Sequence, residues 1–352
     1  MPGFRAHYIF GKNAYENSGI IAEFSPIKSY PMSYGLGLQG PDFFFYDPLA
    51  HLFNRPDIGT QMHHANVMSV FSSLLSHRQK LASSTDRRIA DAYIAGFMAH
   101  YTLDTICHPY VHYRAKKMAH LNEFTYSFGI HVLLETDIDN TLLRHYMHTK
   151  PSQFRTENTI ALSPREKLVI SNLLAHALKE AFPEARICAS QIRQSMRMVW
   201  FINRHMSDPH ALKKKAVRLI DQMLFGHAFV SAIMSVDNQG TYTDPCNLRH
   251  RLWRNPWQPD ITSNEDFFEL MARAQDLFEE RIRLYKLLIS APIRSRIAAT
   301  IDRIRHDKGK EPHAIISHEA SKENYYHNLN TLLENLGDLS YDSGLPLEDQ
   351  AQ

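Results

Sequence analysis

Apolar residues recur at helical spacing over most of the chain from Ile58 onward. We find no alternating strand pattern of useful length and no repeat at a fixed period. The chain is therefore predicted to be all-α, a multi-helix bundle. The predicted helices cover residues 58–81, 86–108, 122–148, 163–182, 184–205, 209–233, 264–289, 291–306 and 322–337.

Local signals set some of these boundaries. Ser163 followed by Glu166 three residues later forms a capping box, which predicts a helix start at 163. Pro109 lacks a backbone N–H and disfavours helical geometry at the residue before it. We therefore expect the helix at 86–108 to end or kink at His108.

Two segments lack the helical pattern. Residues 1–57 are rich in Gly, Pro, Ser and Asn, so they are predicted to be irregular. Their aromatic run, Phe43–Tyr46, favours burial, and we expect this segment to wrap around the helical body. Residues 237–262 are predicted to form a loop between helices. A weak boundary near 150–162 divides the chain into region 1–155 and region 156–352, which either completes the same body or forms a second helical half.

Residues 96–139 hold two series of metal-ligand side chains at four-residue steps. The first is His100, Asp104 and His108, with His112 one step further, and the second is His131, Glu135 and Asp139. On a helix, each series falls on one face. Apolar residues flank both series, and polar groups buried among them are costly unless they are paired or bound to metal. Imidazole and carboxylate suit zinc, so the pattern favours a zinc site.

Composition limits the partners. The 352 residues carry a net charge of +2 with dispersed basic residues, too little to predict binding to nucleic acid or an anionic membrane surface. The 21 histidines slightly favour metal binding. Three cysteines predict no disulfide framework and suit a reducing compartment. No apolar stretch of about 18 residues predicts a membrane span. With no signal-peptide pattern at the N-terminus, the sequence predicts a cytoplasmic protein.

Further candidate ligands lie upstream of the two series. His7 is close to the N-terminus, Asp42 follows a Gly-Pro turn, and His63 and His64 lie in the helix predicted at 58–81. Each alone is a weak signal. Together with H-x3-D, a downstream His and H-x3-E, their order resembles the bacterial zinc-dependent phospholipase C family, whose architecture the P1-type nucleases share. The resemblance covers roughly residues 1–150 and is nearest to an uncharacterised intracellular branch with a similar HY-x-LD-x-x-CHPY segment.

The resemblance implies an all-helical fold with three zinc ions, of which two lie close together. It implies Asp42, His63, His100 and Asp104 as ligands of the close pair, with Asp104 bridging and His7 on the partner ion. The third zinc is expected to be held by His108, His131 and Glu135. Asp139 has no such role to carry over and is expected to support a histidine.

This chain departs from the family at two points. Secreted members use a processed N-terminal tryptophan as a ligand, whereas this chain begins Met-Pro-Gly, so the Pro2 amine is a hypothetical replacement after removal of Met1. The family's downstream histidine usually lies six residues after the bridging Asp. Here the candidates lie four residues after it, at His108, which we favour, or eight, at His112.

These features predict a zinc-dependent phosphodiester hydrolase, similar to phospholipase C, with a metal-bridged hydroxide as the nucleophile. Asp42 is the candidate general base or water-orienting group, and Phe43–Phe45 would line a pocket beside the metals. The expected substrate is a phosphodiester, which includes phospholipid headgroups. The alternative is a non-catalytic helical protein that retains the zinc site for regulation. Nuclease activity is disfavoured because the chain lacks a basic stripe.

Overall fold

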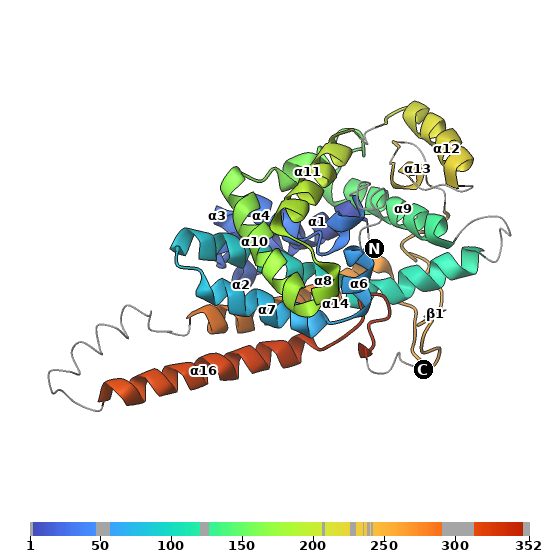
Figure 1. The fold of residues 1–352 in the computed structure, drawn as a ribbon. Helices are drawn as coiled ribbons and strands as arrows, with labels where there is room; N and C mark the ends of the chain where they lie inside the picture. The colour runs from blue at the N-terminus through green and yellow to red at the C-terminus, as the bar shows by residue number, and fades with distance from the viewer. Residues whose placement is uncertain are drawn as a thin grey trace.

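The computed structural model describes residues 3–46, 57–119, 127–205, 208–225, 230–234, 236–237, 240, 242–290 and 313–347. Within these ranges the chain is almost entirely helical, which confirms the predicted all-α class (Figure 1). The strands of the described part form one antiparallel pair, β1 (Trp253–Arg254) and β2 (Thr262–Ser263). No helix among the described residues combines the length and the apolar character needed to cross a bilayer.

The α-helices are α1 (Phe4–Asn17), α2 (Gly19–Ala22), α3 (Ser25–Ser29), α4 (Pro31–Gly37), α6 (Ile58–His64), α7 (Val67–Lys80), α8 (Ser84–Ala119), α9 (Ser127–Met147), α10 (Pro164–Ala181), α11 (Ala189–His205), α12 (Leu212–Phe225), α13 (Val230–Ile233), α14 (Phe267–Ser290) and α16 (His313–Leu336). Short 3-10 helices are η1 (Asp42–Tyr46), η2 (Thr156–Ile160) and η3 (Pro183–Ala185). The capping box predicted for Ser163 and Glu166 is confirmed at the start of α10, with both reciprocal hydrogen bonds present.

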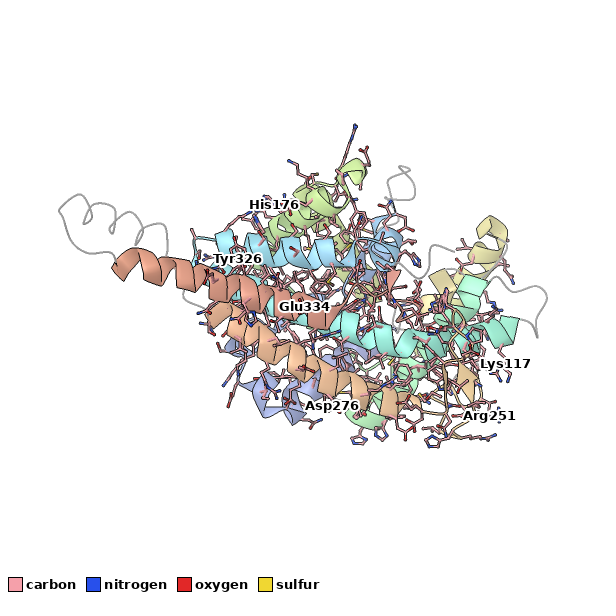
Figure 2. The ribbon with its side chains drawn as sticks, turned by 90° about the horizontal axis from the view of Figure 1, so that it is seen from below. Lys117, His176, Arg251, Asp276, Tyr326 and Glu334 are labelled. Carbon is pink, nitrogen blue, oxygen red and sulfur yellow. The ribbon has the colours of Figure 1, made fainter. Side chains whose placement is uncertain are left out.

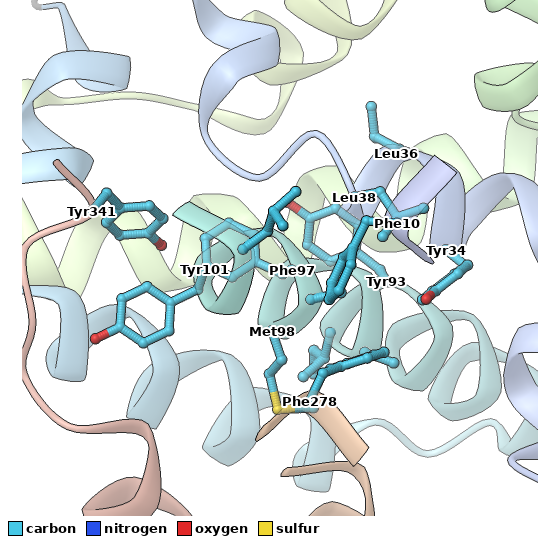
Figure 3. Packing of buried hydrophobic residues seen from close by; sticks show 14 of the residues in the cluster. Phe10, Tyr34, Leu36, Leu38, Tyr93, Phe97, Met98, Tyr101, Phe278 and Tyr341 are labelled. Atoms are coloured by element: carbon cyan, nitrogen blue, oxygen red, sulfur yellow. The ribbon is translucent and has the colours of Figure 1, made fainter. Parts of the chain in front are cut away.

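Helix α8 runs through the centre of the fold and packs against α1, α4, α9, α10 and α14 (Figure 1). Its buried side chains Tyr93, Phe97 and Tyr101 lie among apolar side chains from several of these helices (Figure 3). One hydrophobic cluster extends from Phe4 to Tyr341 and takes in residues from both predicted regions. The division of the chain near residue 155 therefore stays a prediction.

The prediction that residues 1–57 are irregular is wrong for the part of this segment that the structure describes. Residues 3–46 form α1 to α4 and η1, and of these α1, α3 and α4 pack against α8. Except for α1, these helices are four to seven residues long, too short to show a helical period in the sequence. The helix predicted at 58–81 is also divided, because Asn66 adopts a left-handed conformation (φ 57°) between α6 and α7.

We expected the helix to end or kink at His108, and an end there is wrong, because α8 continues through Pro109 to Ala119. A kink at this position stays a prediction. The missing N–H of Pro109 leaves the carbonyl of Thr105 without its helical partner. The C-terminal segment lies against this carbonyl at Gly344, where a side-chain Cβ would come within 2.2 Å of the Thr105 oxygen. Gly344 also has a φ of +65°, so this close approach depends on glycine.

The second half of the chain covers the central helix from the other side. Helix α16, labelled at Tyr326 and Glu334, lies along α14, labelled at Asp276 (Figure 2). It begins at His313, earlier than the predicted start at 322, while the helix predicted at 291–306 lies outside the described residues. After α16 the chain turns back toward α8 and ends its described course at Leu347.

Candidate metal centre

Five of the predicted ligands gather beside α8 in a cluster that we call the inner group. The members are His7 from α1, Asp42 from η1, His63 from α6, and His100 and Asp104 from α8. All five are buried, with at most 4% of their surface exposed. Residues separated by nearly one hundred positions in the sequence therefore meet in one closed polar site.

Asp104 lies at the middle of the inner group. Its Oδ2 is 2.9 Å from His100 Nε2, and its Oδ1 is 3.2 Å from His7 Nε2. Asp42 Oδ1 is 3.1 Å from His63 Nε2 and 3.8 Å from His100 Nε2. Two subsets, His7 with Asp42 and His100, and His63 with His100 and Asp104, each place one ligand atom per residue within 4.8 Å of the others.

Backbone carbonyls fix the direction of three imidazoles. The Nδ1 atoms of His63, His100 and His108 lie 2.7, 3.1 and 3.0 Å from the carbonyl oxygens of Gly59, Leu38 and Tyr341. A carbonyl only accepts, so each Nδ1 carries the proton and donates it. In the neutral tautomer Nε2 then holds a lone pair directed into the cluster, the arrangement that backbone carbonyls impose on metal-ligating histidines by accepting from the other ring nitrogen.

The inner group is rich in charge. Burial would raise the pKa of Asp104, but the imidazoles of His100, His108 and His7 hold it well below its ordinary value. Burial likewise opposes ionisation of Asp42, yet His100 and His63 lower its pKa. Burial would lower the pKa of His63, but the adjoining Asp42 carboxylate raises it to about 9. Without metal, the two carboxylates are therefore ionised and His63 is protonated near neutral pH.

The other three predicted ligands, His108, His131 and Glu135, form what we call the outer group. His131 and Glu135 are one turn apart on α9, with Nε2 2.7 Å from Oε1. His108 approaches from α8, with its Nε2 3.9 Å from Glu135 Oε1 and 3.6 Å from Asp104 Oδ1. The structure thus brings all eight predicted residues into one connected set, and Asp104 lies between the two groups.

The outer group carries little charge. Burial lowers the pKa of His108 to about 4 and that of His131 well below its ordinary value. Burial also raises the pKa of Glu135 well above its ordinary value. Both imidazoles are therefore neutral near pH 7 with a lone pair to offer, while the raised pKa of Glu135 opposes the ionised form in which it would bind metal.

A contribution of the C-terminal segment to the outer group was not predicted from the sequence. The carbonyl of Tyr341 orients His108, and Asp342 lies 3.3 Å from His112 Nε2 and 3.4 Å from His64 Nε2. Burial would raise the pKa of Asp342, but His108 and His112 hold it well below its ordinary value. His64 and His112, the two alternative ligands, therefore face Asp342.

Tyr341 closes the inner group from the same direction. Its side chain is 1% exposed, and its ring centroid lies 4.9 Å from that of His63 and 5.8 Å from that of His100. Its amide donates to the carbonyl of His63. The segment after α16 thus contacts both groups, although nothing in its sequence resembles a ligand pattern.

Asp139, the last member of the second series, contacts α1 rather than a histidine ring. Its carboxylate accepts hydrogen bonds from the backbone N–H groups of Arg5 (3.1 Å) and Ala6 (2.8 Å). These are free donors at the start of a helix, where a negative charge is also favourable. Asp139 therefore fixes the N-terminal turn of α1 immediately before His7, which corrects its expected role.

The aromatic run beside Asp42 is only partly at the site. Phe43 is 0% exposed and belongs to the hydrophobic core, and its ring packs on Phe44. Only Phe45 reaches the cluster, with its ring centroid 5.6 Å from that of His63. The predicted pocket lining by all three residues is therefore wrong. Pro2, the hypothetical N-terminal ligand, lies outside the described residues.

The chemistry of the cluster fits divalent metal. Within the described part of the chain, the buried atoms that lack a hydrogen-bond partner include Asp42 Oδ1, both oxygens of Asp104, and the Nε2 atoms of His7, His63, His100 and His108. Buried acceptors facing other acceptors are unfavourable unless a proton or a cation lies between them. Imidazole nitrogen and carboxylate oxygen are the ligands that zinc takes in catalytic sites.

Comparison with known proteins agrees with this geometry. The family model described as zinc dependent phospholipase C matches residues 6–185, just over half of the 352 residues. The matched range contains all eight predicted ligands and ends before the C-terminal segment with Tyr341 and Asp342. No curated protein and no solved structure matches the chain.

Proposed function

The chain belongs to the zinc-dependent phospholipase C family, and from that premise we propose that it hydrolyses phosphodiesters at zinc ions held by the inner and outer groups. The observation that carries this proposal is the position of Asp104. Its two buried oxygens face imidazoles from α1 and from two turns of α8, at 2.9 to 3.6 Å. A purely structural zinc site would need only one closed cage of four ligands.

Each group has a defined task in this proposal. His7, Asp42, His63 and His100 would hold the closely spaced ions, with Asp104 shared between them. His108, His131 and Glu135 would hold a further ion. When bound, zinc would lower the pKa of a water molecule and neutralise negative charge on the phosphodiester oxygens.

Asp42 has a more limited role than a strong general base. Its lowered pKa keeps it ionised near neutral pH but also makes it a weak proton acceptor. With Oδ1 directed at His63 and His100, the carboxylate is placed to bind metal and to orient a water by accepting its hydrogen bond. Burial of the whole inner group would exclude other water and strengthen these interactions.

A phospholipid headgroup is the substrate that the family suggests, while a generic phosphodiester tests the chemistry alone. The first experiment is therefore zinc-dependent hydrolysis of a soluble chromogenic phosphodiester, followed by phospholipid and nucleic acid. Protein that binds zinc without hydrolysing any of them would favour the non-catalytic alternative.

Adjacent histidines supply a matched pair of variants for this assay. His63→Gln removes a buried imidazole of the inner group, and we expect hydrolysis to fall about a hundredfold or more, because metal-held charge stabilisation is worth several kcal/mol. His64→Gln removes the neighbouring imidazole, whose side chain is 51% exposed, and we expect a change of less than about threefold. Equal losses in both variants would contradict the proposed ligand set.

A further inference from the structure

Helix α12 presents its apolar side to solvent. Leu212, Leu219, Ile220 and Met223 are 69%, 55%, 53% and 75% exposed. Their spacing of seven, one and three residues places all four on one side of the helix. A continuous apolar stripe of this kind normally faces a protein core, so its exposure calls for a covering surface.

The opposite, polar side of α12 is bonded to the protein. Asp221 is 1% exposed and accepts a hydrogen bond from the amide of Ser231 at 2.7 Å. Lys214 donates from Nζ to the carbonyl of Met234 at 2.9 Å, and its amide donates to Asp208 at 2.7 Å. These bonds fix the rotation of the helix about its axis. The apolar side therefore cannot turn inward without breaking them.

The position of α12 in the fold agrees with this orientation. The helix packs on α13, and α13 packs on α9, so the protein body lies behind the polar side (Figure 1). Helix α9 also carries His131 and Glu135 of the outer group. Helix α12 is therefore connected through α13 to the helix that carries part of the candidate metal centre.

Basic side chains border the apolar stripe. Lys213 lies on one edge and Lys215 on the other, both exposed, while the exposed Arg218 lies further round toward the polar side. The acidic residue of the helix, Asp221, is on the buried side. An apolar stripe between basic edges is the pattern of helices that lie in the interface of an anionic bilayer, with the apolar side among the acyl chains and the cations at the headgroups.

We propose that α12 docks the protein on the surface of an anionic lipid bilayer. A second copy of this chain fits the face less well, because two α12 helices would bring their lysine edges together. Protein partners are also disfavoured by the lysines at the edges, since lysine is depleted in such interfaces. The sequence-based expectation of no membrane affinity rested on the low net charge and on basic residues that are dispersed along the chain, and neither registers lysines on both edges of an exposed apolar stripe.

This inference does not depend on the proposed hydrolysis, although the two together would bring phospholipid headgroups to the outer group's side of the molecule. Membrane binding is measured without turnover, so the two proposals fail separately. If the protein binds vesicles but hydrolyses none of the substrates, the docking proposal stands and the proposed function is wrong.

The test is flotation of the full chain with vesicles of phosphatidylcholine alone or mixed with phosphatidylserine. We expect binding to the mixed vesicles, with a loss of about tenfold or more in the Ile220→Glu, Met223→Glu variant, which removes two apolar contacts. Gln222→Glu adds a negative charge on the same exposed helix without removing an apolar side chain, and should retain most of the binding. Lys213→Gln with Lys215→Gln should weaken binding about thirtyfold on the mixed vesicles alone.

Three results would overturn the proposal. The first is equal flotation of the wild type with and without vesicles. The second is equal binding by the Ile220→Glu, Met223→Glu variant and the wild type. The third is a wild-type dimer in light scattering that this variant converts to a monomer, which would assign the face to a second copy. Hydrolysis of a soluble phosphodiester should be unchanged in the variant, which checks that it folds normally.

Discussion

The inner and outer groups contain the same ligand types but differ in charge, burial and support. The inner group has two ionised carboxylates, and its residues lie between His7 and Asp104 on four elements, inside the range matched by the family model. The outer group has two neutral imidazoles and a glutamic acid of raised pKa, and it depends on the carbonyl of Tyr341 for the direction of His108.

This difference implies an order of metal affinity. The ionised carboxylates of the inner group attract a cation, although the proton on His63 must leave when metal binds there, whereas the raised pKa of Glu135 opposes the charged form that would bind metal in the outer group. The side chain of His131 is also 13% exposed, compared with 0% for His100. We therefore expect the inner group to bind zinc more tightly and the outer group to lose it first, as chelator is added or as the pH falls.

The largest effect is expected where the two groups meet. Asp104→Asn keeps the shape of the side chain but removes the charge that faces His7, His100 and His108. We expect zinc to be lost from both groups and hydrolysis to fall about a thousandfold, since this removes several kcal/mol of charge stabilisation. Zinc analysis and steady-state kinetics measure the two effects. Retention of full zinc content by this variant would contradict the shared role of Asp104.

A smaller effect is expected at the outer group alone. Glu135→Gln should remove one zinc ion per chain, leave those of the inner group, and reduce hydrolysis by about ten- to a hundredfold. Titration with a chelator should show one binding phase fewer than in the wild type. If Glu135→Gln removes all the zinc, the two groups are one cooperative site and the comparison between them fails.

The C-terminal segment offers a finer test of how the outer group is supported. Asp342→Asn removes the carboxylate beside His112 and His108, and we expect zinc affinity at the outer group to fall about tenfold with no change at the inner group. Asp338→Asn is the matched control, because Asp338 lies in the same segment but bonds to the amide of Met68. Identical behaviour of the two variants would indicate a general loosening of the segment.

The smallest effect concerns metal-free protein. His63 has a pKa of about 9 when folded and an ordinary value near 6.5 when unfolded, so it stabilises the fold below about pH 6.5 and loses this contribution as the pH rises through 9. In chelator, the melting temperature of the wild type should fall by a few degrees across this window relative to His63→Gln. With zinc bound the difference should vanish. If the melting temperature of the wild type rose over the same pH window, His63 would not be protonated in the folded, metal-free protein.

The sequence was sufficient to predict the fold class and to name residues that the structure brings together, and the reasons are largely local. A spacing of four residues predicts that His100 and Asp104 share one helix face, and that His131 and Glu135 share another. In the structure each pair is in contact on its own helix. His7, Asp42 and His63 followed from their order along the chain in the resemblance. Whether these residues bind zinc stays a prediction, since geometry alone does not establish it.

Other features depend on contacts that no local pattern records. The contribution of Tyr341 acts through its backbone carbonyl, which every residue has, and Gly344 matters because it contacts Thr105 beside Pro109. Pro109 is a local signal for the end or a kink of a helix, yet α8 continues through it to Ala119, which no pattern in the sequence shows. For α12, a period of 3.6 residues identifies an amphipathic helix but not which side faces the protein. Asp221 settles that side through its bond to Ser231.

The most direct test of the metal centre is the zinc content of purified protein, measured by mass spectrometry beside protein concentration. We predict more than one zinc ion per chain in the wild type, a partial loss in the His131→Ala, Glu135→Ala variant, and a larger loss in His100→Ala. Well-folded wild-type protein that contains no zinc, and takes up none when it is supplied, would contradict the account.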